Sequence, residues 1–265
     1  MSDGHDGLAG GPDPGLAGGM VDGAMNGAMN GVAGGITDGA TVPGGWEAWL
    51  PVVATVLLLL VYELLIAVQQ RRRPQRVARS AHAALREDWF DAVSQQPGSE
   101  ILAVQTLRNS LMSATMTAST AALALMGAVT LSAPSLQASL RTASGGLPVF
   151  TPRLALELVL LALLFASLVA SVMAVRYYNH AGFIGGMPVG SAERLRWAAA
   201  GSSYVRQAGV LYGWGLRHLI LVAPLLAALL HPLAGPPAAL VVIGVMLQLD
   251  RFGAIDSGST AGPGG

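Results

Sequence analysis

Residues 46–73 read WEAWLPVVATVLLLLVYELLIAVQQRRR, an apolar run followed closely by three arginines. The run is long enough to cross the ~30 Å hydrocarbon core of a bilayer as a helix. Trp46 and Trp49 stand at one end, as aromatic rings do at a membrane interface, and Arg71–Arg73 follow the other end. This stretch therefore predicts a membrane-spanning helix whose basic end faces the cytoplasm.

The composition of the whole chain agrees with a membrane protein. Its 265 residues are 52% hydrophobic and 11% charged, whereas about a quarter of the residues in soluble domains are charged. The formal net charge is zero and aromatic residues make up 6%, so we expect no nucleic-acid partner. The absence of cysteine excludes disulfides, thiolate metal ligands and cysteine nucleophiles.

Two polar tails flank the apolar part. Residues 1–45 are rich in Gly, Ala, Asp and Asn and cannot bury enough apolar surface to offset their ordering entropy, so we expect a disordered tail. Residues 253–265 are expected to form a second disordered tail. Between them, residues 46–252 are predicted to form one transmembrane helical domain.

Five apolar stretches define the expected fold class, an all-α membrane protein built as a bundle of four to five transmembrane helices with short cytoplasmic amphipathic helices. The uncertainty in number lies in the last two stretches. They form either one kinked helix or a hairpin, and Gly235-Pro236-Pro237 favours the hairpin because proline lacks an amide hydrogen. The expected spans are residues 46–68, 101–131, 153–178, 218–232 and 237–250. The second is longer than one span requires, so that it either tilts or begins as an exposed helix.

Arginine placement predicts the orientation. Most arginines fall in residues 71–100, 179–217 and 250–265, whereas the loop near 135–152 keeps only Arg141 and, at its edge, Arg153. Positive charges favour the cytoplasmic side. We therefore expect a multi-pass protein of the bacterial inner membrane, with its N-terminus outside and its C-terminus in the cytoplasm.

Two segments between the spans have amphipathic character. In residues 76–93, Ala81, Leu85 and Trp89 recur on one side at helical spacing, which is typical of a helix lying on the membrane surface. Residues 190–212 are similar and begin with Ser191, a good N-cap residue.

Charged residues inside the apolar stretches need partners, because ionisable groups are costly in hydrocarbon. Counted from the cytoplasmic ends of their spans, Glu63 and Arg108 lie at similar depth and are predicted to form a buried ion pair that fixes helix register. Near the opposite face, Glu157 and His231 also match in depth, and we expect both to reach the interface.

Polar side chains follow one face of the second stretch. This face allows close helix packing or lines a water path, and the residues leave both interpretations open. Because Arg108, Thr115 and Ser119 lie opposite, we expect protein to cover both polar faces and only the Leu107/Leu111/Ala118 face to meet lipid. The polar face consists of Thr106, Asn109, Ser110, Ser113, Thr117 and Thr120, and the candidate polar residues of this stretch also include Gln105 and Arg108.

Arg176-Tyr177-Tyr178-Asn179-His180 ends the third span, where the tyrosines fit an aromatic belt. Arg176, Tyr177, Asn179 and His180 form a candidate cytoplasmic motif. No phosphate loop, zinc helix, nucleophile elbow or dinucleotide fingerprint occurs in the sequence. We therefore expect no catalytic residues, no metal and no cofactor.

Three stretches resemble one known family. Residues 100–112 (EILAVQTLRNSLM) with 118–120, residues 176–183 (RYYNHAGF) and residues 215–220 (GLRHLI) are similar to the family catalogued as domain of unknown function 599. The resemblance covers about Trp46 to Arg251. It implies a multi-spanning membrane protein of unassigned activity and supplies motif positions rather than catalytic ones: Gln105, Arg108, Asn109 and Arg176 to His180.

Two functions compete on the sequence. The first is small-solute or ion permeation by a homo-oligomer, using the polar face of the second span. The second is a non-catalytic assembly or scaffold subunit that packs against another membrane protein. In either case the partners are the lipid bilayer and a second copy or another membrane protein.

Overall fold

The computed structural model describes residues 45–72, 78–142 and 150–255. The expected tails, 1–45 and 253–265, lie outside these ranges except for Gly45 and residues 253–255. Every regular element of the described residues is a helix, and five of these helices are long and apolar enough to cross a membrane. The expected all-α membrane fold is therefore confirmed. The elements are η1 (Trp46–Ala48), α2 (Trp49–Arg72), α3 (Ala78–Gln95), α4 (Glu100–Thr142), α5 (Pro152–Gly185), α6 (Ala192–Leu230), η4 (Pro232–Ala234) and α7 (Gly235–Ile255).

The last two apolar stretches form two helices. α6 ends at Leu230, His231 adopts an extended conformation, and α7 begins at Gly235 after the short η4 turn. Pro236 and Pro237 lie in the first turn of α7, where an amide hydrogen has no partner within the helix and its loss costs nothing. The hairpin is thus the correct alternative.

Three helices are much longer than a bilayer requires. α4, α5 and α6 contain 43, 34 and 39 residues, whereas about 20 residues cross the hydrocarbon core. α2 and α7, with 24 and 21 residues, match that thickness. α4, α5 and α6 must therefore extend well beyond the membrane.

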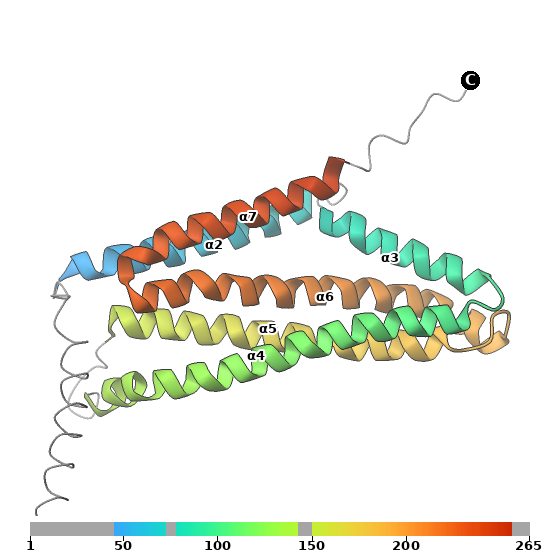
Figure 1. Ribbon diagram of the computed structural model, residues 1–265, viewed down its shortest axis with the longest axis horizontal. Helices are drawn as coiled ribbons and strands as arrows, with labels where there is room; N and C mark the ends of the chain where they lie inside the picture. The colour runs from blue at the N-terminus through green and yellow to red at the C-terminus, as the bar shows by residue number, and fades with distance from the viewer. Residues whose placement is uncertain (1–44, 73–77, 143–149, 256–265) are drawn as a thin grey trace, which may run out of the picture. The chain divides into compact units, whose positions relative to one another are not determined.

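The positions of the shorter helices indicate which part of α4, α5 and α6 extends beyond the membrane. α2 and α7 lie along one half of the long helices, and α3 lies along the other half (Figure 1). α3 carries Arg86, Glu87, Asp88 and Asp91, charges that hydrocarbon would not accept. We therefore assign the bilayer to the half with α2 and α7, the membrane half. The other part, α3 with the adjoining parts of α4, α5 and α6, is the protruding half.

Each half has its own apolar core. The membrane half is built on buried residues that include Leu59, Ile66, Leu160, Leu164, Leu221, Leu225 and Met246. At its far end Trp49 stacks on Phe150, with ring centroids 5.7 Å apart, as in an aromatic belt. The protruding half is built on Phe90, Leu107, Ala114, Ala174, Tyr178, Ala181, Ile184, Val205 and Ala208.

This division moves the polar part of α4 out of the bilayer. Counting about 20 residues back from Leu140, near the C-terminal end of α4, reaches Thr120. The segment from Gln105 to Thr117 therefore belongs to the protruding half, and the expected span 101–131 covers only part of a longer helix. The depth that we assigned to Arg108 was counted from Ile101, which lies outside the membrane.

The two amphipathic segments differ from expectation in their packing. The Ser191 side chain caps its helix by accepting the Arg194 amide at 3.2 Å, as predicted, but this helix continues to Leu230 without a break. α3 packs against α6 through Ala83, Phe90 and Val93 rather than lying on lipid through Leu85 and Trp89.

Candidate functional site

Both motif segments meet in the protruding half, on either side of Tyr178. This tyrosine is 3% exposed, and its ring separates two grooves. The Arg86 groove, of about 320 Å³, is lined by Leu85, Arg86, Trp89, Thr106, Leu107, Ser110, Tyr178 and Val205. The Arg108 groove, of about 390 Å³, is lined by Val104, Leu107, Arg108, Leu111, Tyr178, Asn179, Gly182 and Phe183. Four helices thus position one compact site.

Among the described residues, Arg86 is the only charged one that lines the Arg86 groove. Its side chain is half-buried and crosses from α3 to α6, where it lies over Gly209. Among the described residues it has no hydrogen-bond or ion-pair partner. The Ser110 hydroxyl on the opposite wall donates to the Thr106 carbonyl at 3.2 Å.

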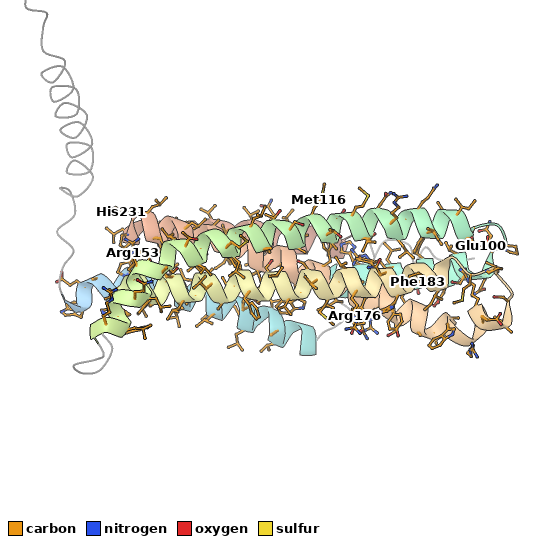
Figure 2. The ribbon with its side chains drawn as sticks, turned by 90° about the horizontal axis from the view of Figure 1, so that it is seen from below. Glu100, Met116, Arg153, Arg176, Phe183 and His231 are labelled. Atoms are coloured by element: carbon orange, nitrogen blue, oxygen red, sulfur yellow. The ribbon has the colours of Figure 1, made fainter. Side chains whose placement is uncertain are left out.

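The Arg108 groove brings together the two predicted motif segments. Arg108 on α4 and Asn179 on α5 line it and are both exposed, as is the Phe183 ring (Figure 2). Gln105 and Asn109 are exposed on neighbouring positions of α4. The sequence therefore identified one wall of the site, whereas it assigned Trp89 to a lipid-facing side and gave Arg86 no role in a site.

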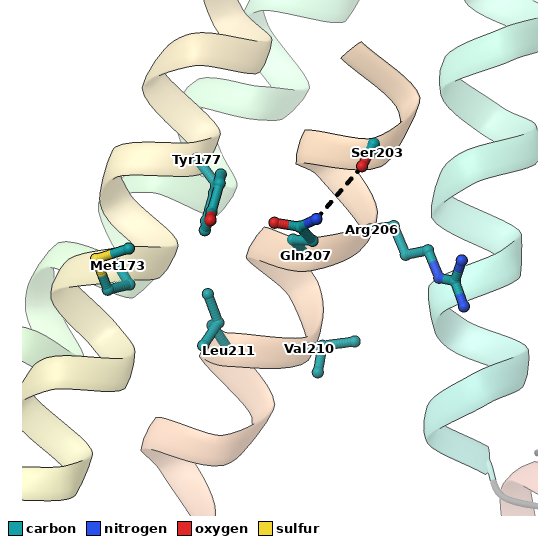
Figure 3. Close-up of a pocket in the computed structure, with 7 residues that line it drawn as sticks. All are labelled: Met173, Tyr177, Ser203, Arg206, Gln207, Val210 and Leu211. Carbon is teal, nitrogen blue, oxygen red and sulfur yellow. Dashed lines mark hydrogen bonds between the residues drawn. The ribbon is translucent and has the colours of Figure 1, made fainter. Parts of the chain in front are cut away.

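A third groove lies between α5 and α6 and has a volume of about 520 Å³ (Figure 3). The Gln207 amide on its wall donates to Ser203 at 3.4 Å, and Arg206 extends toward α3, where its Nε lies 3.8 Å from Glu87. The Tyr177 and His180 rings each pack 5.7 Å from that of Tyr204. The tyrosines at 177 and 178 thus pack within the protruding half instead of forming a lipid-facing belt, while Arg176 is exposed.

The far tip of the protruding half is held by Arg194, whose role the sequence did not reveal. Its guanidinium donates to the carbonyls of Gly185 at 2.7 Å and Met187 at 2.6 Å, and to Ser94 at 3.2 Å. Beside it, the Glu100 carboxylate accepts the Val189 amide at 2.9 Å. These contacts tie α3 and α4 to the connection between α5 and α6.

The structure does not bring Glu63 and Arg108 together. Glu63 lies in the membrane half on α2, which packs against α5, α6 and α7, whereas Arg108 is exposed in the protruding half. Next to Glu63, the Tyr62 hydroxyl accepts a hydrogen bond from Arg217 at 2.9 Å. The expected pair is absent because Ile101, from which the depth of Arg108 is counted, belongs to the protruding half.

The polar face of α4 is exposed rather than covered by protein. Leu107, expected to meet lipid, is buried and contacts α5 beside Gly185. Among the hydroxyl residues of the predicted polar face, all of which are described, only Thr117 is buried. The hydroxyls of Ser110, Ser113, Thr115, Thr117 and Thr120 each donate to the carbonyl four residues earlier, so the helix satisfies them itself.

At the opposite end of the bundle, Glu157 and His231 do not behave alike. His231 is exposed at the end of α6, near Arg153 in Figure 2. The Glu157 side chain is fully buried and accepts from Arg153 Nε at 3.0 Å and Ser135 Oγ at 3.2 Å. The expectation that Glu157 reaches the interface is therefore wrong, because α4 and α5 cover it.

No group of three or more metal-ligating side chains occurs within the described ranges. The fold and the site together define a multi-pass helical membrane protein with a helical protrusion that carries grooves lined by arginine. The chain belongs to the family described as protein of unknown function DUF599, whose profile matches residues 50–254. No curated protein and no solved structure matches it.

Proposed function

We propose that this protein is a non-catalytic assembly subunit of the bacterial inner membrane and forms a homo-oligomer through the outward face of α4. The observation that carries the proposal is the coverage of α4. α5 packs on it at both ends, whereas its opposite face is exposed in both halves, with Met116 pointing away from the bundle (Figure 2). A helix of 43 residues, about 64 Å long, thus has one open face.

A second copy suits this face in the membrane half. Gly127 lies on the exposed face of α4, on the same side of the helix as Thr120 and Thr130. A Cβ added at Gly127 would have no atom within 4 Å, so the space beside it is open. Both threonine hydroxyls donate to their own helix, at 2.9 and 3.1 Å. Small residues with satisfied hydroxyls let two membrane helices approach closely. In a two-fold dimer one patch meets its own copy, so no second surface is needed.

The arginines support a cytoplasmic protruding half. Arg141 and Arg153 lie at the opposite end of the bundle. Because positive charge is retained on the cytoplasmic side, the N-terminus would lie outside and the C-terminus in the cytoplasm. The arginines of the protruding half with described side chains are Arg86, Arg108, Arg176, Arg194, Arg196 and Arg206.

Small-solute or ion permeation, the first hypothesis from the sequence, has less support. It rested on a polar α4 face inside the bilayer, but the segment from Gln105 to Thr117 extends beyond the bilayer in our assignment. Buried residues between the helices of the membrane half are mostly large and apolar. Assembly therefore accounts for the exposed face better than a water path does.

Cysteine cross-linking tests the proposal, since the chain has no native cysteine. In native membranes, we expect Gly127→Cys to form disulfide-linked dimers upon oxidation. Leu240→Cys, on the equally exposed α7, is the matched control and should remain monomeric. Purified protein in liposomes should conduct no ions. Absence of the Gly127→Cys dimer would contradict self-association, and ion flux blocked by a thiol reagent on Ser113→Cys would favour permeation instead.

A further inference from the structure

We propose that the Arg86 groove binds a phosphate group carried on an apolar body, supplied either by an anionic lipid headgroup or by a small free phosphate ester. The inference stands apart from the proposed assembly function, because the groove is built from four helices of a single copy. Its evidence is the charge, the shape and the lining of the groove.

The charge of the groove is uncompensated within the described residues. Of the acidic residues on α3, Glu87 faces Arg206, Asp91 accepts from the Ser202 hydroxyl, and Asp88 is exposed and does not line the groove. Within the described ranges, no carboxylate lines this groove or the adjoining one, which holds Arg108. A half-buried guanidinium without a carboxylate is expected to attract an anion.

The guanidinium of Arg86 lies against Gly209. A Cβ at Gly209 would overlap this guanidinium, so a larger residue there would displace the end of the Arg86 side chain. Arginine presents several N–H groups in one plane and pairs with phosphate oxygens through two parallel hydrogen bonds. The guanidinium that packs against Gly209 offers this planar group of donors to a phosphate.

The remaining lining favours an amphiphilic ligand. Three lining residues carry hydroxyls, Thr106, Ser110 and Tyr178, and the apolar part of the lining is Leu85, Trp89, Leu107 and Val205. The volume of about 320 Å³ lies at the lower end of the ~300–1,000 Å³ typical of small-molecule sites. A phosphate joined to a ring or a short chain fits this combination better than a fully polar ion.

The groove lies within reach of both sources. Gly209 precedes Arg217 on α6 by eight residues, about 12 Å, and Arg217 bonds Tyr62 of the membrane half. A headgroup at the bilayer surface and a solute in the aqueous phase can therefore both approach Arg86. A lipid headgroup and a free ester would present the same phosphate group to Arg86, so separate test compounds are needed to distinguish them.

Thermal unfolding of the purified full chain tests the inference. In mild detergent, millimolar phenyl phosphate represents the free ester, while phosphatidylglycerol nanodiscs compared with phosphatidylcholine nanodiscs represent the lipid. At least one probe should raise the unfolding temperature of the wild type. Arg86→Gln should raise the probe concentration needed for the same increase in unfolding temperature about tenfold or more, as expected for losing a charge-assisted hydrogen bond. Arg196→Gln removes an equal charge from an exposed position and should respond like the wild type.

A second variant keeps the test independent of the folding of Arg86→Gln. Thr106→Phe fills the groove from an exposed position of α4 and should abolish the response, whereas Gln105→Phe, its exposed neighbour outside the groove lining, should retain it. A response to phenyl phosphate assigns a free ester, and a response to phosphatidylglycerol alone assigns a headgroup. The inference is overturned if neither probe stabilises the wild type, or if Thr106→Phe and Gln105→Phe respond alike.

Discussion

Arg194 is 2% exposed, although arginine is seldom buried to this extent. Its burial is tolerated because two backbone carbonyls and Ser94 accept from its guanidinium. The carbonyls belong to Gly185 and Met187, where α5 ends and the connection to α6 begins. One side chain therefore satisfies backbone groups that the end of α5 leaves without partners.

We expect Arg194→Met to lower the free energy of unfolding by about 2–4 kcal/mol, because the buried carbonyls lose a charged donor. Arg196→Met is the control, since Arg196 is exposed and lies only over its neighbouring Trp197 ring. The measurement is thermal unfolding followed by circular dichroism in detergent. Equal stability of the two variants would show that the Arg194 contacts do not hold the tip.

The residues that sequence reasoning placed correctly are those with local causes. Ser191 caps a helix that starts one residue later, so its role is visible in a short window. Arg194 was missed because its partner Ser94 lies 100 residues earlier in the chain. The Glu63–Arg108 pair was wrong for a similar reason, since depth depends on where the bilayer crosses α4, and no local pattern gives that position.

At the scale of the helices, α3 is held by a close contact with α6. Phe90 is fully buried, and a Cβ at Gly201 would lie 2.5 Å from its ring. The same Cβ would lie 3.2 Å from Ile184, so an added methyl group at position 201 would be crowded from two directions. Gly201 thus sets the distance between α3 and α6.

Gly201→Ala should therefore weaken the docking of α3, at a cost of about 1–3 kcal/mol from overpacking. Hydrogen exchange should accelerate in α3 and remain slow in α5. Gly213→Ala, elsewhere on α6, meets no atom within 4 Å and should be neutral or stabilising by up to about 1 kcal/mol through helix propensity. Unchanged exchange in α3 of Gly201→Ala would contradict the assigned contact.

The sequence predicted helices better than it predicted their lengths and faces. The hairpin between α6 and α7 followed from Pro236 and Pro237, whose effect on the backbone is intrinsic. Hydropathy marked only the membrane part of α6, because the part before His218 is polar on its outer side. The buried face of α3 differs by one position from the face that the sequence predicts. Phe90, rather than the predicted Trp89, meets a glycine of α6.

For the whole molecule, the position of the bilayer and the orientation can be tested together. With single cysteines and an aqueous thiol reagent, Leu233→Cys, at the α6–α7 turn, should react from outside the cell. Ser113→Cys should react in inverted vesicles only, and Leu123→Cys, exposed on α4 within the membrane half, should react in neither. Maleimide chemistry requires water around the thiol, so protection reports hydrocarbon.

Reaction of Ser113→Cys from outside would reverse the proposed orientation. Its protection from both sides, together with reaction of Leu123→Cys, would place the bilayer elsewhere along α4. Met116→Cys, one turn from Thr120 and highly exposed, provides an intermediate position for locating the boundary.

α4, α5 and α6 each pass from the membrane half into the protruding half without an interruption, so the protrusion has no hinge at the bilayer surface. The prolines inside these helices, Pro134 and Pro224, lie within the membrane half. Mechanically, the three helices act as stiff levers pivoting in the lipid. For a protruding arm of about 30 Å, a 10° change in tilt would sweep the tip sideways by about 5 Å. Membrane thickness and lateral tension would thus be converted into movement of the arginine-lined grooves.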